Sequence, residues 1–443
     1  MGWVFTLARS AIFQLQQTNR RRKALGLDRC RDIVVCPGLS SVALPNFSAA
    51  NEEESAMALL VLNAGSSSLK LALYDDDAVV RQAALSLERI GTDEARLRGD
   101  RETAKVNAPD HATAFERIVS RLEEGSASQV NAIGHRVVHG GSDYHEPEPI
   151  TPRLLESLRN LEQIDPTHMP QALAVMAAAT KRFRNVAQIA CFDTAFHRLM
   201  PRVAQQYPLP RWTMKAGVRR YGFHGLSCES ILRQLHEMKA GAGRVLIAHL
   251  GNGASVTAVR DGVSVDTSMG FSPTSGIMMG TRCGDLDPTV LTYLARTQAM
   301  GIDALEQLVN ERSGLLGVSG LGQDMRDLLE AAESNSEAAE AIELYCYTAR
   351  KYFGALAAVL GGVETIVFTG GVGENAAPIR ENICAGLLHL GVDLDLERNR
   401  AHEVTISSDK SRVTVRVVRT NEDLMIAKHV ARLLQRGVTH VDV

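Results

Sequence analysis

The feature that most constrains this chain is a set of three turns, rich in glycine and small polar residues, that each follow an apolar run. The first turn links the runs at 59–62 and 69–73, and the second links those at 245–250 and 256–259. An apolar run, a small polar turn and a second run are typical of a β-hairpin. Two units of this design predict a duplicated domain, and such a pair could hold a polyphosphate between two lobes.

The third turn, at 369–376, follows an apolar run at 363–368 and precedes a helix that Pro378 opens. Gly371, Gly373 and Ala376 also match the dinucleotide-binding fingerprint, with Asp393 at the required distance. A dinucleotide site, however, is complete within one βαβ unit and would leave the two earlier turns unexplained. We therefore favour the adenosine end of ATP, because glycines allow it to approach the backbone closely.

Charge and cysteine usage exclude several classes of protein. The 443 residues, 45% apolar and 22% charged, are typical of a folded chain of two or three domains. Lys and Arg number 48 and Asp and Glu 51, so no basic field predicts nucleic acid as a partner. No apolar run is long enough to predict a membrane span. The seven cysteines are scattered without a CxxC pair, which favours a reducing compartment over disulfides or zinc.

Residues 1–56 differ in character from the rest of the chain. They contain a basic run at 20–23, a stretch rich in Pro, Ser and Asn at 37–51 and an acidic run at 52–54. Met1-Gly2 with Thr6 matches the minimal myristoylation pattern, and the Arg-rich, acid-poor composition matches a transit peptide. Motifs this short recur by chance, so we expect a disordered leader or a misassigned start, with Met57 as the true start.

Seven short motifs stand in order along the remainder of the chain. They are NAGSSSLK (63–70), GHRVVHGG (134–141), FDTAFH (192–197), RRYGFHG (219–225), HLGNG (249–253), MGTRCGDLDP (279–288) and GGVGEN (370–375). Each motif alone is weak, but the ordered set is specific. From about Met57 to Leu434 the sequence resembles the acetate kinase family.

The resemblance implies an α/β fold of duplicated actin-like (ribonuclease H-like) ATPase domains with ATP in the interdomain cleft. We expect one domain at 57–196, completed by a C-terminal helix within 420–443, and a second at 197–419. The implied reaction is reversible phosphorylation of acetate by Mg-ATP in a cytoplasmic homodimer. A propionate or butyrate kinase, a sugar kinase and a non-catalytic ATP-binding regulator are the alternatives.

A carboxylate acceptor requires cationic groups, and arginine presents the matching planar fork. Arg136 and Arg282 lie among apolar and glycine neighbours, which favours buried, paired charges over solvated ones. By resemblance, both hold the acyl carboxylate and the transferring phosphoryl group, while His224 donates to the phosphoryl oxygens in the transition state.

The family's usual label for Asp193 is proton donor or acceptor. Phosphoryl transfer to a carboxylate gives that label little support, because the acid has a pKa of about 4 and is already ionised at neutral pH. We therefore expect Asp193 to organise the arginines or magnesium-bound water.

The resemblance also assigns residues to the metal and the nucleotide. Asn63 and Glu422 would flank Mg²⁺, with Mn²⁺ as a possible substitute ion and Asp423 as an alternative ligand. Magnesium prefers oxygen ligands and substrate phosphates, which suits this set. The residues assigned to ATP are Lys70, His249, Leu250, Gly251, Asn252, Gly253, Asp324, Met325, Arg326, Gly371, Val372, Gly373, Glu374 and Asn375.

The acyl pocket is where the chain departs from the family. By resemblance, Val138, Phe223, Pro273 and Thr167 line this pocket, but Thr167 stands where the family usually has Leu. Met169 likewise replaces a usual Asn, and 274–275 differ from the usual Leu-Glu. We expect the Thr167 hydroxyl to bond to nearby backbone. Because one methylene changes discrimination by only about 1–3 kcal/mol, the sequence does not separate acetate from propionate.

Overall fold

A computed structural model describes residues 57–99, 102–125, 129–241 and 243–437. The interpretations given above for residues 1–56 lie outside the described residues. The described residues belong to one unit, 54–443.

The first sheet contains eight strands in the order β5-β4-β3-β2-β1-β6-β8-β7. Strands β1 and β2 form the first predicted hairpin, in which Asn63 pairs with Lys70. Strands β6 and β8 then run parallel to β1. The strands are β1 (Met57–Ala64), β2 (Ser68–Asp75), β3 (Arg81–Glu88), β4 (Arg96–Arg98), β5 (Thr103–Lys105), β6 (Gln129–Val137), β7 (Glu148–Pro149) and β8 (Ala187–Phe192).

The second sheet contains five strands in the order β11-β10-β9-β12-β13. Strands β9 and β10 form the second predicted hairpin, and β12 and β13 run parallel to β9. The strands are β9 (Arg244–Leu250), β10 (Ala254–Arg260), β11 (Val263–Thr267), β12 (Thr365–Thr369) and β13 (Thr414–Val417).

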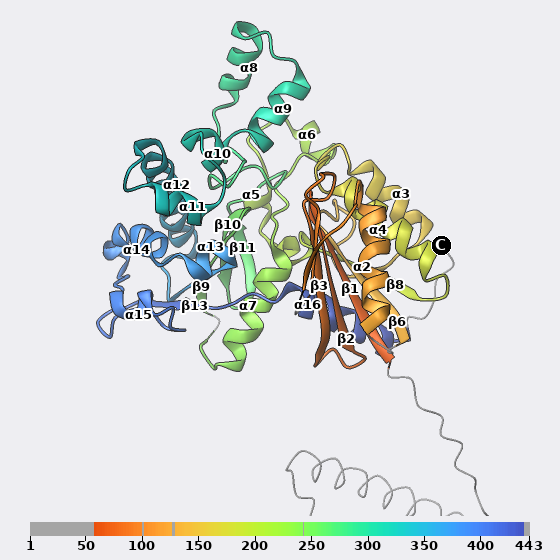
Figure 1. Cartoon of the computed structure of the whole chain (residues 1–443). Coiled ribbons are helices and arrows are strands. Elements are labelled where there is room, and N and C mark those ends of the chain that lie inside the picture. The colour runs from red at the N-terminus through yellow and green to blue at the C-terminus, as the bar shows by residue number, and fades with distance from the viewer. Residues whose placement is uncertain (1–56, 100–101, 126–128, 242, 438–443) are drawn as a thin grey trace, which may run out of the picture. The chain divides into compact units, whose positions relative to one another are not determined.

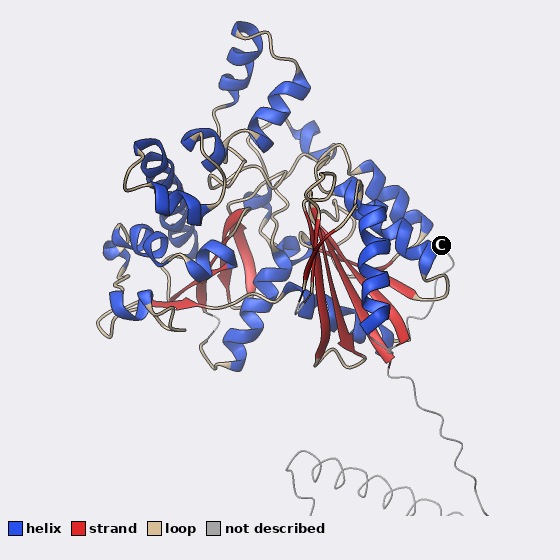
Figure 2. Cartoon of the chain, in the orientation of Figure 1, coloured by secondary structure: helices blue, strands red, loops and turns tan. Residues whose placement is uncertain are grey.

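The two sheets share one topology (Figures 1 and 2). In each, three antiparallel strands joined by hairpins are followed by two strands parallel to the first, giving β3-β2-β1-β6-β8 and β11-β10-β9-β12-β13. The first sheet adds β4 and β5 at one edge and β7 at the other. The predicted duplicated α/β fold is therefore confirmed.

Helices separate and cover the sheets. The helices are α2 (His111–Gly125), α3 (Pro152–Asn160), α4 (Met169–Arg182), η1 (Ala195–Leu199), α5 (Arg202–Gln205), α6 (Arg211–Lys215), α7 (Gly225–Glu237), α8 (Pro288–Thr297), α9 (Ile302–Glu311), α10 (Gly314–Ser319), α11 (Met325–Ala331), α12 (Ser336–Leu360), α13 (Gly370–Asn375), α14 (Ala377–Ala385), η2 (Leu388–Leu390), α15 (Leu396–Arg400) and α16 (Glu422–Gln435).

Alternating side chains divide the first sheet into two buried faces. Leu60 and Leu62 pack with helices α2 and α4, whereas Leu59 and Val61 pack with α16. Gly134 of β6 allows α16 to approach closely, because a Cβ atom there would lie 2.4 Å from a methyl carbon of Ile426. We call this sheet with α2, α3, α4 and α16 the first lobe.

The second sheet is also covered on both faces. Helix α12 packs against one face, and α7 packs against the other through residues such as Ile231 and Leu235. Asn335 caps the start of α12, and Gly361 ends it with a φ of 69° that favours glycine. We call this sheet with α7 and the helices from α8 to α15 the second lobe.

Helices α7 and α16 contact each other between the two sheets (Figure 1). The layers are therefore α2/α4, first sheet, α16, α7, second sheet and α12. Within the described residues, no helix combines the length and apolar character needed to cross a membrane.

Candidate active site

Arg136 lies at the centre of a charged cluster between the lobes. It comes from the end of β6, and its side chain is largely buried. It donates to the Oδ1 of Asn63 at 3.2 Å, forms an ion pair with Asp193, and lies 3.7 Å from a carboxylate oxygen of Glu422. Burial opposes the charge on Arg136, but Asp193 and Glu422 outweigh it and raise the pKa of the guanidinium. Arg136 is therefore a fixed cation shared among three oxygen-bearing side chains.

Asp193 directly follows β8 and is fully buried. Burial raises the pKa of Asp193 to about 6, although the charge of Arg136 opposes the rise and Glu422 adds to it. One carboxylate oxygen pairs with Arg136, while the other, Oδ1, is buried and has no hydrogen-bond partner among the described residues. The backbone amide of Leu226 also lies near the carboxylate and acts to lower its pKa.

His224 stands at the start of α7 in a left-handed backbone conformation, with a φ of 61°. Its ring stacks on that of His249, with ring centres 4.1 Å apart. Nδ1 of His224 lies 2.9 Å from the hydroxyl of Ser255, and Nδ1 of His249 lies 2.8 Å from that of Ser227. Burial, then the nearby charges, hold the pKa of His224 well below its usual value. The pair is therefore neutral at physiological pH.

Arg282 approaches from a loop of the second lobe. Its guanidinium donates to the carbonyl oxygen of Pro273 at 3.2 Å and lies 3.2 Å from Nε2 of His168. A Cβ atom on Gly253 would lie 3.3 Å from Nε2 of His224 and 3.5 Å from a terminal nitrogen of Arg282. The glycine therefore leaves open the space on which the histidine and this arginine converge.

These groups line a cavity of about 240 Å³. All four predicted catalytic residues and three of the predicted acyl-pocket residues lie on its wall. The lining consists of Gly65, Ser66, Ser67, Ser68, Arg136, Val138, His168, Asp193, Phe223, His224, Asn252, Gly253, Pro273 and Arg282. We call this the inner cavity.

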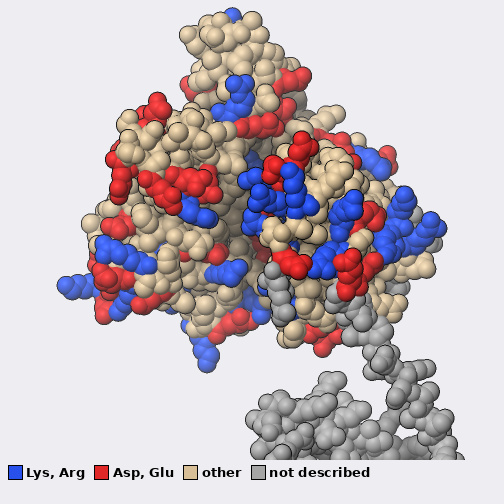
Figure 3. Space-filling model, viewed as in Figure 1, with Lys and Arg blue, Asp and Glu red and all other residues tan. Residues whose placement is uncertain are grey.

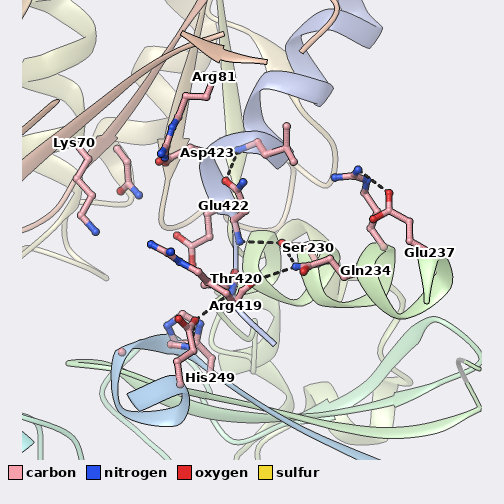
Figure 4. A pocket seen from close by; sticks show the side chains of 17 residues that line it. Lys70, Arg81, Ser230, Gln234, Glu237, His249, Arg419, Thr420, Glu422 and Asp423 are labelled. Carbon is pink, nitrogen blue, oxygen red and sulfur yellow. Dashed lines mark hydrogen bonds and ion pairs between the residues drawn. The ribbon is translucent and has the colours of Figure 1, made fainter. Parts of the chain in front are cut away.

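A larger cavity of about 850 Å³ contains the predicted metal-binding and several predicted nucleotide-binding residues. Figure 4 shows Lys70 and Arg81 on one side, His249 on the other, and Glu422 and Asp423 between them. Asn63, Gly371 and Glu374 also line it. In Figure 3, Lys and Arg side chains gather along the groove between the lobes, on the side of the first lobe. We call this the outer cavity.

The donor set at Asn63 and Glu422 fits a hard cation. Both side chains present oxygen atoms, and both contact Arg136, so they lie close together. Among the described residues, no three His, Cys, Asp or Glu side chains cluster as a complete metal site. A magnesium ion that keeps waters and substrate phosphates as ligands needs no such cluster.

Other residues that the sequence assigned to ATP do not line these two cavities with their side chains. The side chain of Asp324 caps the start of α11 by accepting a hydrogen bond from the backbone N–H of Arg326. Met325 is buried in the core of the second lobe. Leu250 is also buried in that core, so only its backbone could face a ligand.

The sequence model of the acetokinase family matches residues 58–428. The chain belongs to the acetokinase family. An acetate kinase from Methylocella silvestris is 44% identical over 398 residues, which cover 85% of this chain and 98% of that protein.

Solved structures of the acetokinase family superimpose on the chain. An acetate kinase from Porphyromonas gingivalis has a TM-score of 0.77 and 37% identity, covering 86% of this chain and all of that one. A propionate kinase from Francisella tularensis has a TM-score of 0.80 and 35% identity, covering 84% of this chain and 98% of that one.

Two features of the third turn differ from a dinucleotide-binding site, the interpretation that the sequence analysis disfavoured. The helix after β12, α13, has only six residues, and a non-helical Ala376 separates it from α14. Asp393, the expected ribose ligand, instead accepts a hydrogen bond from Ser408 at 2.5 Å. The glycines that match the fingerprint instead join strand β12 to the short helix α13.

Thr167 lies apart from the other residues predicted for the acyl pocket. It does not line the inner cavity; it lies in a neighbouring cavity of about 520 Å³ against the loop at 271–274 and helix α9. The sequence predicts a hydrogen bond from the Thr167 hydroxyl to nearby backbone. In the structure, this hydroxyl instead donates to the side chain of Asp165 at 3.0 Å. The carboxylate that holds the hydroxyl lies two residues earlier, at Asp165.

Sequence reasoning also missed several residues of the inner cavity. Ser66, Ser67 and Ser68 line it from the first turn, and His168 reaches Arg282. The serines could have been assigned from the hydroxyl-rich turn alone, because such turns suit anions. His168 gave no local signal, since its partner Arg282 is distant in the sequence.

Proposed function

We propose that this protein is an acetate kinase that transfers the terminal phosphoryl group of ATP to a carboxylate, reversibly, giving an acyl phosphate and ADP. The observation that carries the proposal is the convergence of Arg136, Arg282 and a neutral His224 in a small cavity next to a cavity suited to nucleotide phosphates. Two arginines match a carboxylate and a phosphoryl group better than they match sugar hydroxyls.

The reaction needs positioning and charge neutralisation more than covalent help. A carboxylate oxygen forms a bond to the γ-phosphorus while the bond from that phosphorus to the leaving oxygen of ADP breaks, and ADP keeps the electron pair. Arg136 and Arg282 would hold the carboxylate and neutralise charge on the phosphoryl oxygens. Because both guanidiniums are held by other groups, little reorganisation is needed during transfer.

His224 would act as a neutral hydrogen-bond donor. When its Nδ1 accepts from Ser255, its proton resides on Nε2, which faces Gly253 and the inner cavity. A hydrogen bond from Nε2 to a phosphoryl oxygen then stabilises the transition state. The lowered pKa keeps the ring uncharged, so its role is donation and not proton transfer.

Asp193 would organise the site. Its contact with Arg136 fixes one guanidinium, and its free oxygen can bind water near the phosphates. The substrate is already ionised at neutral pH, so no proton must be removed from it.

A divalent cation, which we assign as Mg²⁺ with Mn²⁺ as a substitute, would be held by Asn63 and Glu422. When bound, it neutralises phosphate charge and orients the terminal phosphoryl group. Lys70, His249 and the backbone of the second hairpin turn would hold the phosphates, with Gly371 toward the adenosine. The start of α16, at Glu422, adds a positive helix end to this region.

Acetate is the favoured substrate and propionate the alternative. The inner cavity is small, and Val138, Phe223 and Pro273 form its apolar wall. Related proteins carry both names, acetate kinase and propionate kinase. Because Thr167 lies outside this wall, the pocket that selects the acid is defined by the other three side chains.

The same proposal includes a homodimer, a cytoplasmic location and two domains. One domain comprises 57–196 together with 420–443, and the other comprises 197–419.

The support for a homodimer comes from helices α8 and α9. They project from the second lobe in Figure 1 and expose apolar side chains, including Tyr293 at 62% and Ile302 at 83%. Exposed apolar side chains of this kind favour burial against a partner. Free thiols at the five described cysteines support a reducing compartment.

Trapping with hydroxylamine tests the proposed activity. The full chain is incubated with ATP, Mg²⁺, hydroxylamine and acetate, propionate or butyrate, and acyl hydroxamate is measured by its ferric colour. We expect acetate-dependent hydroxamate and equal amounts of ADP. ADP formation with a hexose but no hydroxamate with any acid would instead identify a sugar kinase. If no acceptor gives a product, both kinase assignments are rejected, and the non-catalytic ATP-binding regulator is the alternative that fits.

A further inference from the structure

Asp165, Thr167 and His168 form a polar cluster at the wall of the inner cavity, and the mechanism above uses only the contact of His168 with Arg282. Nδ1 of His168 lies 2.8 Å from Oδ1 of Asp165, and the Thr167 hydroxyl lies 3.0 Å from the same oxygen. Nε2 of His168 lies 3.2 Å from a terminal nitrogen of Arg282. A carboxylate is thereby connected through an imidazole to a proposed catalytic arginine.

The direction of each hydrogen bond in this cluster follows from donor and acceptor chemistry. A guanidinium has only N–H donors, so Nε2 of His168 must accept. The proton of a neutral imidazole then resides on Nδ1 and is donated to the carboxylate of Asp165. The Thr167 hydroxyl also donates to Asp165, and its oxygen lies 3.0 Å from Nδ1 of His168, where it can share the Nδ1 proton. Asp165 therefore selects the one tautomer of His168 that can accept from Arg282.

Burial makes this arrangement rigid. Asp165 is only 2% exposed, and His168 is largely buried as well. Burial alone would raise the pKa of Asp165, but the hydrogen bonds from His168 and Thr167 and the charge of Arg282 outweigh it and keep that pKa below its usual value. The carboxyl group is thus ionised while it accepts both hydrogen bonds.

The cluster also stands at the boundary between two cavities. Arg282 and Pro273 line both the inner cavity and the neighbouring 520 Å³ cavity, whereas Asp165 and Thr167 line only the latter. The guanidinium is held on this boundary by the carbonyl of Pro273 and by His168. Its remaining N–H groups are the ones available to the inner cavity.

We infer that Asp165 is a positioning residue that, through the tautomer of His168, fixes Arg282 in the orientation that binds the carboxylate and the phosphoryl group. Thr167 supports Asp165 in this task. The inference rests on the proposed kinase activity, because it concerns how Arg282 performs its part in that reaction.

The first test compares two substitutions of Asp165 in the full chain. Asp165→Ala removes the acceptor, whereas Asp165→Asn retains an oxygen that can accept from His168. We expect Asp165→Ala to lower kcat/KM for acetate by about 10- to 100-fold, the range that misplacement of a catalytic group produces. Asp165→Asn should retain most of the activity, and KM for ATP should stay unchanged in both variants.

Glu229→Gln is the matched control, since Glu229 pairs with His429 at 2.7 Å in another carboxylate–histidine contact that lines neither the inner nor the outer cavity. It should leave kcat/KM for acetate unchanged. Thr167→Val, which keeps the shape but removes the hydroxyl, should cause a smaller loss than Asp165→Ala. This variant also covers the case in which Asp165→Ala does not fold.

A double-mutant cycle separates positioning from a general structural effect. In an Arg282→Ala background, Asp165→Ala should cause less than about a twofold further loss, because coupled residues are non-additive. Equal losses in both backgrounds, or wild-type kinetics in a folded Asp165→Ala protein, would overturn the inference. Absence of acyl phosphate from the unsubstituted protein would instead reject the proposed function.

Discussion

The two lobes are built on the same strand order, yet they present different chemistry to the groove between them. Strands of the first sheet end in Arg136 and Asp193, and α16 adds Glu422. The second sheet ends in glycine-rich turns at 251–253 and 370–371. His224 and Arg282 reach the site from the start of a helix and from a loop, and not from strand ends of the second sheet.

A duplicated fold thereby divides one reaction between its two halves. In our proposal, the strand ends of the first lobe supply fixed charges at the transferring group, and the strand ends of the second supply backbone that a polyphosphate can approach, while Arg282 and His224 join the site from outside the second sheet. Substitutions of the charged residues in the first lobe should therefore reduce turnover. A Cβ atom added to a glycine turn of the second lobe should instead fill part of the inner cavity or weaken nucleotide binding. Four experiments test this division.

Arg136→Ala should have the largest effect. It removes the cation and leaves the buried carboxylate of Asp193 and the partly buried carboxylate of Glu422 without this partner. We expect kcat to fall by about 1,000-fold or more, while ATP binding persists in a direct titration. Arg121→Ala, at an exposed arginine that pairs with Glu124, is the control. Turnover near that of the unsubstituted protein would reject Arg136 as a catalytic group.

Asp193→Asn should reduce kcat by about 100-fold through loss of the fixed guanidinium. Because the pKa of Asp193 is raised to about 6, its carboxylate becomes protonated and loses the ion pair as the pH falls through 6. Activity should therefore decrease on the acid side near pH 6 in the unsubstituted protein, and this limb should be absent from the variant.

The sign for stability is opposite to that for activity. A folded-state pKa of Asp193 above the unfolded value favours the folded protein at low pH. The free energy of unfolding should therefore decrease, relative to the variant, as the pH rises through about 6.

A solvent deuterium isotope effect on kcat near one is expected if Asp193 organises the site. A large isotope effect that disappears in the variant would make it a general base.

Gly253→Ala tests the backbone contribution of the second lobe. The added methyl group would occupy the space on which His224 and Arg282 converge. We expect kcat to fall by about 10-fold or more, since small displacements of reacting groups are costly. Gly354→Ala, at a helical glycine with no atom near the added carbon, is the control. Unchanged turnover would place the reacting groups elsewhere.

Gly371→Ala should have the smallest effect and should change only nucleotide binding. No protein atom lies within 4 Å of the added carbon, so the fold should tolerate it and the melting temperature should not decrease. An ATP molecule lying against this backbone would be displaced, raising KM for ATP by about 10-fold, or roughly 1.4 kcal/mol, with kcat unchanged. A KM equal to that of Gly354→Ala would remove Gly371 from the nucleotide site.

Much of the fold could be predicted from local patterns. Both hairpins and the strand–glycine–helix junction occur where apolar runs meet small residues, because those patterns depend on neighbours in the chain. The candidate residues were harder to assign. Thr167 was expected in the acyl pocket, yet the carboxylate of Asp165 draws its hydroxyl toward another cavity.

Local sequence patterns specify the two repeated strand–turn–strand units and the kinds of side chain available for catalysis. Tertiary contacts set which of these side chains meet: Arg136 with Asn63, Asp193 and Glu422, and His168 with Arg282. The physical reason is that these contacts join residues distant in the sequence, whereas periodicity reports only on neighbours. Protonation and tautomer also depend on burial and on these partners, so they became assignable only when the lobes were seen together.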